Sequence, residues 1–137
     1  MNATNATNEY MLLFRGNDWY KNISPEQMQE VAGQMMAWFK NLAEQGKVLA
    51  GSPLDNKGKV VSGKNGRVVA DGPFAESKEA VGGYFLLKVD NLDEATVIAQ
   101  QCPILAHGGK VEVRPVLEQC PFSGEAVPDV ELAEATA

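Results

Sequence analysis

Four ionisable side chains lie close together in the middle of the chain, where Asp71 is followed by Glu76, Lys78 and Glu79. Asp71 could act as a hydrogen-bond acceptor or as a general base whose pKa is raised by burial. Lys78 and one glutamate could orient a small polar or anionic ligand at the mouth of a pocket. A structural interpretation stays open beside each of these: residues 71–74 (Asp-Gly-Pro-Phe) can form a tight turn, and the charged cluster can be a solvated connection.

Further candidates for chemistry lie near the end of the patterned part of the chain. His107 is the only histidine, and it could act as an acid or a base near neutral pH or be an ordinary surface residue. Glu112 and Arg114 are two positions apart, so on a strand they share a face and could form an ion pair or a dimer contact, or Arg114 could bind an anion. The candidate catalytic residues are Asp71 and His107, and the candidate ligand-binding residues are Glu76, Lys78, Glu79 and Arg114.

Other chemistries lack a matching pattern. The sequence contains no metal-ligand spacing, glycine-rich phosphate loop or nucleophile elbow, so we expect neither a metal nor a cofactor. Cys102 and Cys120 each precede a proline and form no Cys-x-x-Cys pair. They are expected to be two reduced thiols.

The charge distribution excludes several classes of partner. The net charge of −6 comes mainly from residues after Arg114, which include five acidic residues and no lysine or arginine. A nearly neutral body with an acidic tail gives no electrostatic basis for binding nucleic acid or an anionic membrane surface. No apolar run approaches the roughly 20 residues that cross a bilayer, and the first residues do not resemble a secretion signal. The expected compartment is the cytoplasm.

The elements that would position these residues can be read from caps and periodicity. Residues 9–15 are predicted to form a strand that is apolar on both faces. A first helix begins after Ser24, with Pro25 at its first position and Gln27 completing a capping box, and it ends at Gly46. A stripe of methionine, aromatic and aliphatic residues along this helix could suggest a ligand groove, but it is assigned to the core: Met28, Val31, Met35, Trp38, Phe39 and Leu42.

The second half of the chain alternates strands with one more helix. Strands are predicted at 48–50, at 59–63 and 67–71 joined by a two-residue turn at Asn65-Gly66, at 82–89 in the centre of a sheet, and at 110–116. Asn91 caps a second helix that ends before Pro103.

This order predicts an α+β fold of the ferredoxin-like βαββαβ type with an inserted β-hairpin arm. The domain spans residues 9–116, preceded by a loose N-terminus at 1–8 and followed by the acidic tail at 117–137. Two helices can cover only one face of the sheet, whereas residues 10–14 and 84–89 are apolar on both. We therefore expect a homodimer in which two sheets pack face to face, forming a dimeric α+β barrel with a cavity between subunits.

One long motif resembles a known family. Residues 68–79 (Val-Val-Ala-Asp-Gly-Pro-Phe-Ala-Glu-Ser-Lys-Glu), followed by Gly82-Gly83-Tyr84, are similar to the signature of the DGPF branch of the YCII-related family, and the resemblance covers roughly residues 9 to 116. It implies a dimeric, ferredoxin-like α+β barrel. Some YCII-related proteins resemble lyases or isomerases with a proposed His and Asp pair, and DGPF members tend to accompany extracytoplasmic-function sigma factors. The first helix here contains no histidine where the enzyme-like branch carries one.

Three functions remain open at this point. The leading hypothesis is a homodimer whose inter-subunit cavity holds a small acidic or aromatic metabolite without a cofactor. The second is a cofactor-free isomerase or lyase that uses Asp71, with or without His107, for proton transfer. The third is a protein partner in sigma-factor or stress regulation that uses the acidic tail or the β-arm as its contact surface.

Overall fold

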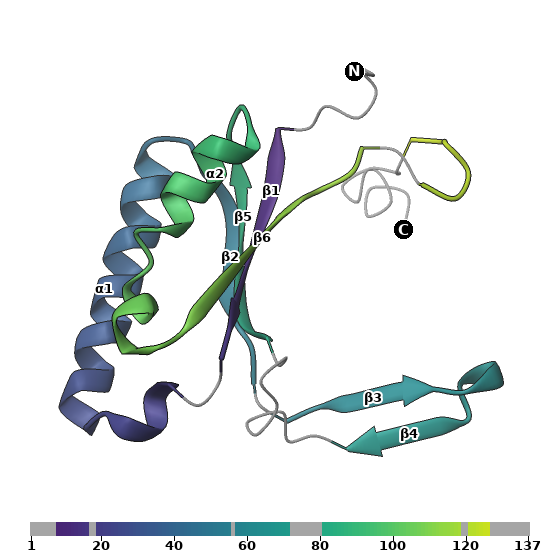
Figure 1. Ribbon diagram of the computed structural model, residues 1–137, viewed down its shortest axis with the longest axis horizontal. Helices are drawn as coiled ribbons and strands as arrows, with labels where there is room; N and C mark the ends of the chain where they lie inside the picture. Colours follow the sequence, from purple (N-terminus) through teal and green to yellow (C-terminus); the bar gives the residue numbers. More distant parts are fainter. Residues whose placement is uncertain (1–7, 17–18, 56, 72–80, 119–120, 127–137) are drawn as a thin grey trace, which may run out of the picture.

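The computed structural model describes residues 8–16, 19–55, 57–71, 81–118 and 121–126. Its main sheet is antiparallel with the strand order β2-β5-β1-β6, and both helices cover the same face (Figure 1). This is the ferredoxin-like α+β arrangement, so the predicted fold is confirmed, with β5 and β1 in the centre as expected. The strands are β1 (Glu9–Arg15), β2 (Val48–Pro53), β5 (Val81–Lys88) and β6 (Lys110–Pro115).

Two capped helices form the layer on this face. In α1 (Pro25–Glu44) the Ser24 side chain accepts a hydrogen bond from the Gln27 amide, and the Gln27 side chain accepts one from the Ser24 amide. This completes the capping box that the sequence predicts. In α2 (Leu92–Ala99) the Asn91 side chain accepts a hydrogen bond from the Glu94 amide. Three short 3₁₀ turns connect the elements: η2 (Trp19–Asn22), η3 (Lys64–Gly66) and η4 (Pro103–His107).

The core lies between the helices and the sheet. Every second residue of β1, namely Tyr10, Leu12 and Phe14, is buried against the helices, as strand periodicity requires. The ring of Phe14 lies 5.0 Å from that of Phe85 and 6.1 Å from that of Trp38. Aromatic pairs at these distances contribute about 0.5–1.5 kcal/mol each beyond the area they bury. This cluster therefore fixes α1 to the middle of the sheet.

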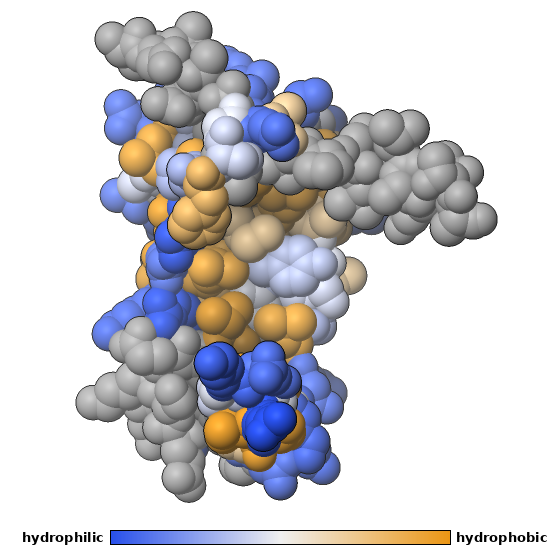
Figure 2. Space-filling view, turned by 90° about the vertical axis from the view of Figure 1, so that its right-hand side faces the viewer, coloured by the Kyte–Doolittle hydropathy of each residue, from blue (hydrophilic) through white to orange (hydrophobic). Residues whose placement is uncertain are grey.

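The opposite face of the sheet is open. Met11 and Leu13 of β1 lie beside Leu86 and Tyr84 of β5 on this face, and all four side chains are half-buried within one copy. Figure 2 looks at this side of the molecule, and apolar and weakly polar residues occupy its middle. The expectation that the two helices leave one face uncovered is thus confirmed; the second copy that would cover it stays a prediction.

The β-arm forms a separate two-stranded sheet that projects from the open side (Figure 1). It consists of β3 (Lys59–Ser62) and β4 (Val68–Asp71). The predicted two-residue turn is wrong, because Ser62 pairs with Val68 and the five residues 63–67 connect the strands. The reason lies in the backbone: Gly63 has φ 81° in addition to Asn65 at 62° and Gly66 at 69°, so the chain turns over a longer stretch than a two-residue loop.

Candidate ligand-binding site

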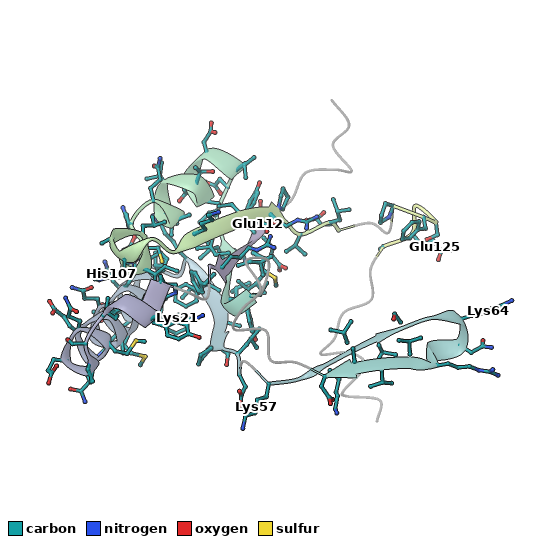
Figure 3. The ribbon with its side chains drawn as sticks, turned by 60° about the horizontal axis from the view of Figure 1, so that its bottom comes forward. Lys21, Lys57, Lys64, His107, Glu112 and Glu125 are labelled. Atoms are coloured by element: carbon teal, nitrogen blue, oxygen red, sulfur yellow. The ribbon has the colours of Figure 1, made fainter. Side chains whose placement is uncertain are left out.

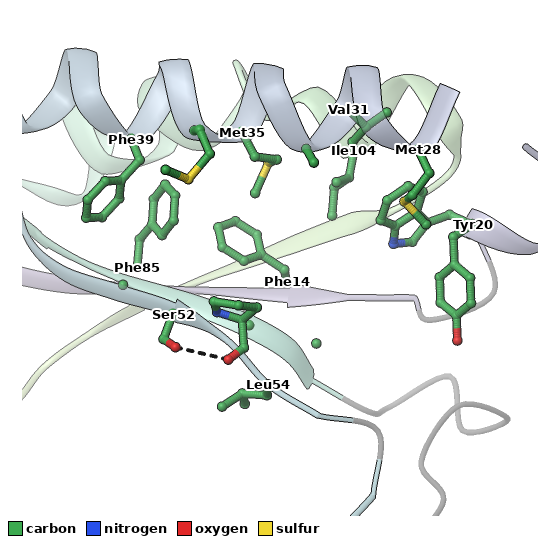
Figure 4. A pocket seen from close by; sticks show the side chains of 17 residues that line it. Phe14, Tyr20, Met28, Val31, Met35, Phe39, Ser52, Leu54, Phe85 and Ile104 are labelled. Carbon is green, nitrogen blue, oxygen red and sulfur yellow. Dashed lines mark hydrogen bonds between the residues drawn. The ribbon is translucent and has the colours of Figure 1, made fainter. Parts of the chain in front are cut away.

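A cavity of about 600 Å³ lies between α1 and the sheet of a single chain (Figure 4). In the close-up, Met28, Met35 and Phe39 extend from the helix toward Phe14 and Phe85, which rise from the strands. Helix α1 contributes Met28, Val31, Ala32, Met35, Met36 and Phe39, and the sheet contributes Phe14, Gly51, Ser52, Pro53, Gly82, Gly83 and Phe85. Trp19, Tyr20, Leu54 and Ile104 complete the lining.

The helix stripe has two parts with different roles. Val31, Trp38 and Leu42 are buried in the core, whereas Met28 is 36% exposed and Met36 is 70% exposed at the cavity. Met35 and Phe39 are partly buried against the core and also line the cavity, and Met36 lies outside the predicted stripe. The assignment to the core was therefore wrong for Met28 alone among the residues of the stripe. Methionine is flexible and polarizable, and it is favoured on surfaces that adapt to different ligands. Methionines at helical spacing were the sequence signal that could have located this site.

Glycines in β2 and β5 leave space for the aromatic side chains of the cavity. A Cβ atom at Gly51 would lie 2.7 Å from Cδ1 of Phe85 and 2.9 Å from Cε1 of Phe39, so no side chain fits there. At Gly83 a Cβ atom would lie 3.1 Å from the Ser52 carbonyl oxygen. The missing side chains let the aromatic rings lie close to the backbone of β2 and β5, which leaves room beneath α1.

The lining is almost entirely apolar. Among the lining residues that the structure describes there is no Asp, Glu, Lys, Arg or His. The Ser52 hydroxyl donates a hydrogen bond to the Pro53 carbonyl at 3.0 Å, and Tyr20 stands at one end of the cavity (Figure 4). Such a site selects a ligand by shape and ring contacts, with few polar groups to orient it.

His107 stands behind one wall of this cavity. It ends η4, which packs against α1 and η2, and its ring lies 6.2 Å from that of Trp19 at an angle of 30°. Trp19 lines the cavity and His107 does not. The imidazole is therefore close to the site, but Trp19 lies between them.

Asp71 is far from this arrangement within one chain. It ends β4 in the β-arm, its side chain is 72% exposed, and it forms an ion pair with Lys59 of β3. Figure 3 shows the β-arm and His107 on opposite sides of the molecule. One copy therefore does not bring Asp71 and His107 together. Glu76, Lys78 and Glu79 lie outside the described residues.

Glu112 and Arg114 form an ion-pair group on the open sheet face. Glu112 accepts a hydrogen bond from Arg15 of the neighbouring strand, and it lies 3.6 Å from Arg114. The cross-strand ion pair predicted from the sequence is thus confirmed for Glu112, with Arg15 of β1 as its partner. The Arg114 side chain remains 67% exposed, so a role in anion binding or in a dimer contact is still a prediction.

Cys102 is a buried free thiol next to the cavity lining. Its Sγ atom donates to Sδ of Met35 at 3.9 Å, and it is 4% exposed. Burial raises the pKa of Cys102 to about 11, an effect that a hydrogen bond with the Ile104 backbone reduces. A thiol with this pKa stays protonated near neutral pH, so it packs as a small apolar group. Cys120 lies outside the described residues.

In the described segments, no group of three or more His, Cys, Asp or Glu residues is arranged to hold a metal ion. The same segments contain no helix with the length and apolar character needed to span a bilayer.

These features define a two-layer α+β domain with a ferredoxin-like sheet and an apolar cavity between its layers. Comparison with known protein families agrees with this fold, because residues 9–120 match the family model of the YCII-related domain. The chain belongs to the YCII-related family. No curated protein matches its sequence. The DGPF branch remains a resemblance based on residues 68–84.

Proposed function

We propose that this protein is a cytoplasmic homodimer that binds a small uncharged molecule, aromatic or aliphatic, in the cavity beneath α1. The observation that carries this proposal is a cavity of about 600 Å³ whose described lining contains no charged side chain. Ligand pockets commonly measure roughly 300–1,000 Å³ and are mostly apolar with a few polar groups. The free thiol of Cys102 supports a reducing compartment.

The lining also narrows the ligand class expected from the sequence. Aromatic rings in the lining can stack on a planar molecule or contact it edge to face: those of Phe14, Trp19, Tyr20, Phe39 and Phe85. An acidic ligand would lose its hydration here without meeting a cation from the described lining, at a cost of several kcal/mol. For this cavity we therefore propose an uncharged ligand, whereas an acidic or aromatic ligand in the cavity between subunits stays a prediction.

Two alanines of α1 provide a matched test. Ala32 lines the cavity, whereas Ala37 is exposed on the same helix outside it. Ala32→Leu should fill part of the cavity and lower ligand affinity at least about fivefold, or 1 kcal/mol, while Ala37→Leu should leave affinity unchanged. Both substitutions exchange one good helix former for another, so helix propensity stays similar.

The probes are indole, 1-naphthol and octanol, with benzoate and succinate as charged comparisons. We expect the three uncharged probes to raise the Tm of the wild-type protein, and octanol, which does not fluoresce, to change the tryptophan fluorescence, because Trp19 lines the cavity. The proposal fails if none of the three uncharged probes binds, or if the charged molecules stabilise the protein equally.

The homodimer is supported by the open sheet face. Met11, Leu13 and Leu86 give this face an apolar centre, and contiguous apolar surface on a soluble protein commonly marks an interaction site. Burial of the two equivalent faces against each other would produce a symmetric interface. Regulation through a protein partner and proton transfer by Asp71 and His107 stay predictions, and no described contact brings those two residues together.

A further inference from the structure

Two exposed segments extend from opposite ends of the open sheet face. One is the β-arm, residues 57–71, and the other is the C-terminal segment, residues 117–126, of which 119–120 are not described. Figure 1 shows both pointing away from the helices, the teal β-arm beyond one end of the strands and the yellow C-terminal segment beyond the other. The open face lies between them.

The β-arm exposes apolar side chains on both of its faces. Val61 pairs with Val69 on one face, and Val60 and Val68 lie on the other. These four valines are 47–61% exposed. A two-stranded hairpin is marginally stable in water unless it packs against something else. The valines therefore indicate a surface that a second molecule covers.

The charge of the β-arm is mainly positive. Residues 57–67 carry four cations and no acid: Lys57, Lys59, Lys64 and Arg67. The single acid of the arm, Asp71, forms an ion pair with Lys59, so Lys57, Lys64 and Arg67 give the arm its net positive charge. Lys57 lies at the base of the arm and Lys64 at its tip (Figure 3). The cations are thus distributed along the length of the arm.

The C-terminal segment has the complementary properties. Phe122 is 97% exposed and Leu117 is 47% exposed, which is unusual for such side chains without a partner surface. Glu118 and Glu125 belong to the five acidic residues that follow Arg114 without any cation. The apolar and acidic side chains of the C-terminal segment are therefore complementary to the valines and the cations of the β-arm.

The symmetry of the dimer determines whether the β-arm of one copy can contact the C-terminal segment of the other. Two copies packed through their open faces have two limiting orientations. With the two-fold axis parallel to the strands, each β-arm meets the other β-arm, and cations face cations. With the axis perpendicular to the strands, each β-arm meets the C-terminal segment of the other copy. Only the second orientation brings opposite charges together, and like charges in contact are unfavourable.

We infer that each β-arm clasps the C-terminal segment of a second copy, with its valines against Leu117 and Phe122 and its cations against Glu118 and Glu125. This inference rests on the homodimer proposed above and adds its orientation and its recognition elements. The partner is a second copy of this chain.

Two charge-reversal variants test the clasp. The arm variant carries Lys57→Glu and Lys64→Glu, and the tail variant carries Glu118→Lys and Glu125→Lys. Sedimentation equilibrium measures the dimer dissociation constant of each, and circular dichroism verifies that the chains fold. We expect each variant alone to dimerise at least about tenfold more weakly than the wild type, which corresponds to 1.4 kcal/mol. The wild-type dimer should also weaken as salt screens the contacts.

An equimolar mixture of the two variants provides the specific control. In a mixed dimer, the negative arm of one chain meets the positive tail of the other, and the positive arm meets the negative tail, so the mixture should regain dimers of near wild-type affinity. If the arms met each other, the arm variant alone would dimerise as well as the wild type, and the inference would be wrong. A monomeric wild-type protein would overturn the homodimer itself, whereas a stable dimer unaffected by either reversal would overturn the clasp alone.

Discussion

Gly51 shows how a single residue without a side chain shapes the cavity. A Cβ atom at this position would lie 2.7 Å from the ring of Phe85 and 3.1 Å from the Tyr84 carbonyl oxygen. We expect Gly51→Ala to lower the free energy of unfolding by about 1–3 kcal/mol, because overpacking forces the ring or the backbone to move. Urea denaturation measures this change.

Gly33 provides the control with the opposite sign. It lies in α1 with nothing within 4 Å of its ideal Cβ position, so Gly33→Ala should stabilise the protein by about 0.5–1 kcal/mol. If both substitutions have the same effect, close packing at Gly51 is not what requires glycine there.

The pKa of Cys102 predicts a loss of stability at high pH. The folded protein holds this thiol protonated up to about pH 11, above its ordinary value of 9.0. The unfolded chain therefore loses the proton first, so the stabilisation is complete below pH 9 and is lost as the pH rises from 9 to 11. In a Cys120→Ser background, the protein should lose up to about 2–3 kcal/mol more over this range than the same protein with Cys102→Ala. If the two proteins lost the same free energy of unfolding between pH 9 and pH 11, the raised pKa of Cys102 would be contradicted.

Prediction from the sequence had a clear limit at the residue scale. Residue types with obvious chemistry, such as Asp71 and His107, stand out in a sequence, and strand periodicity placed Glu112 and Arg114 on one face. The cavity was not located, because the methionines at helical spacing that line it belong to residue types that also form ordinary cores. Whether Met28 packs into the core or lines a cavity depends on the space that the glycines of β2 and β5 leave beneath α1. These residues come together only in the folded chain.

The beginning of α1 links local structure to the cavity. The Ser24 side chain caps the helix, and Met28 in the next turn lines the cavity. We expect Ser24→Ala to lower the free energy of unfolding by about 0.5–2 kcal/mol and to weaken binding of the uncharged probes, because fraying displaces Met28. Urea denaturation and thermal shift measure the two effects, and Ser62→Ala in the β-arm is the control. Unchanged stability would show that the capping box does not hold the helix start.

At the scale of elements, the sequence predicted a helix or strand boundary well where a single residue determines it. The caps at Ser24 and Asn91 marked both helix starts, and the alternation of Val111 and Val113 with charged residues marked the last strand. The turn of the β-arm was predicted less well, since Asn65-Gly66 favours a two-residue loop in isolation. Its length depends on the conformation of Gly63, which the dipeptide rule does not include.

The whole-molecule prediction concerns the open sheet face. Leu86 lies at its centre beside Met11 and Ala50, whereas Val97 is exposed on α2 in the other layer. Leu86→Lys should convert the dimer into a folded monomer at micromolar concentration, because a charge buried between two apolar sheets is unpaired. Val97→Lys should remain dimeric, and light scattering distinguishes the two. A dimeric Leu86→Lys protein would place the interface elsewhere.

The order of elements and the uncovered face of the sheet could be deduced from the sequence, because both follow from periodicity and area. The orientation of two copies could not be deduced, since it depends on where the β-arm and the C-terminal segment leave the sheet. That information exists only in the folded chain.

The chain leaves the main sheet for the β-arm and returns to it at nearly the same place. Pro53 pairs with Gly83, and the Leu54 amide donates to the Gly82 carbonyl at 2.9 Å, so the ends of the excursion are adjacent. An insertion closed in this way can be lengthened, shortened or replaced by a tight turn at a modest entropic cost, without altering the register of β2 and β5. The cavity beneath α1 and the proposed clasp of the β-arm can therefore change independently of each other.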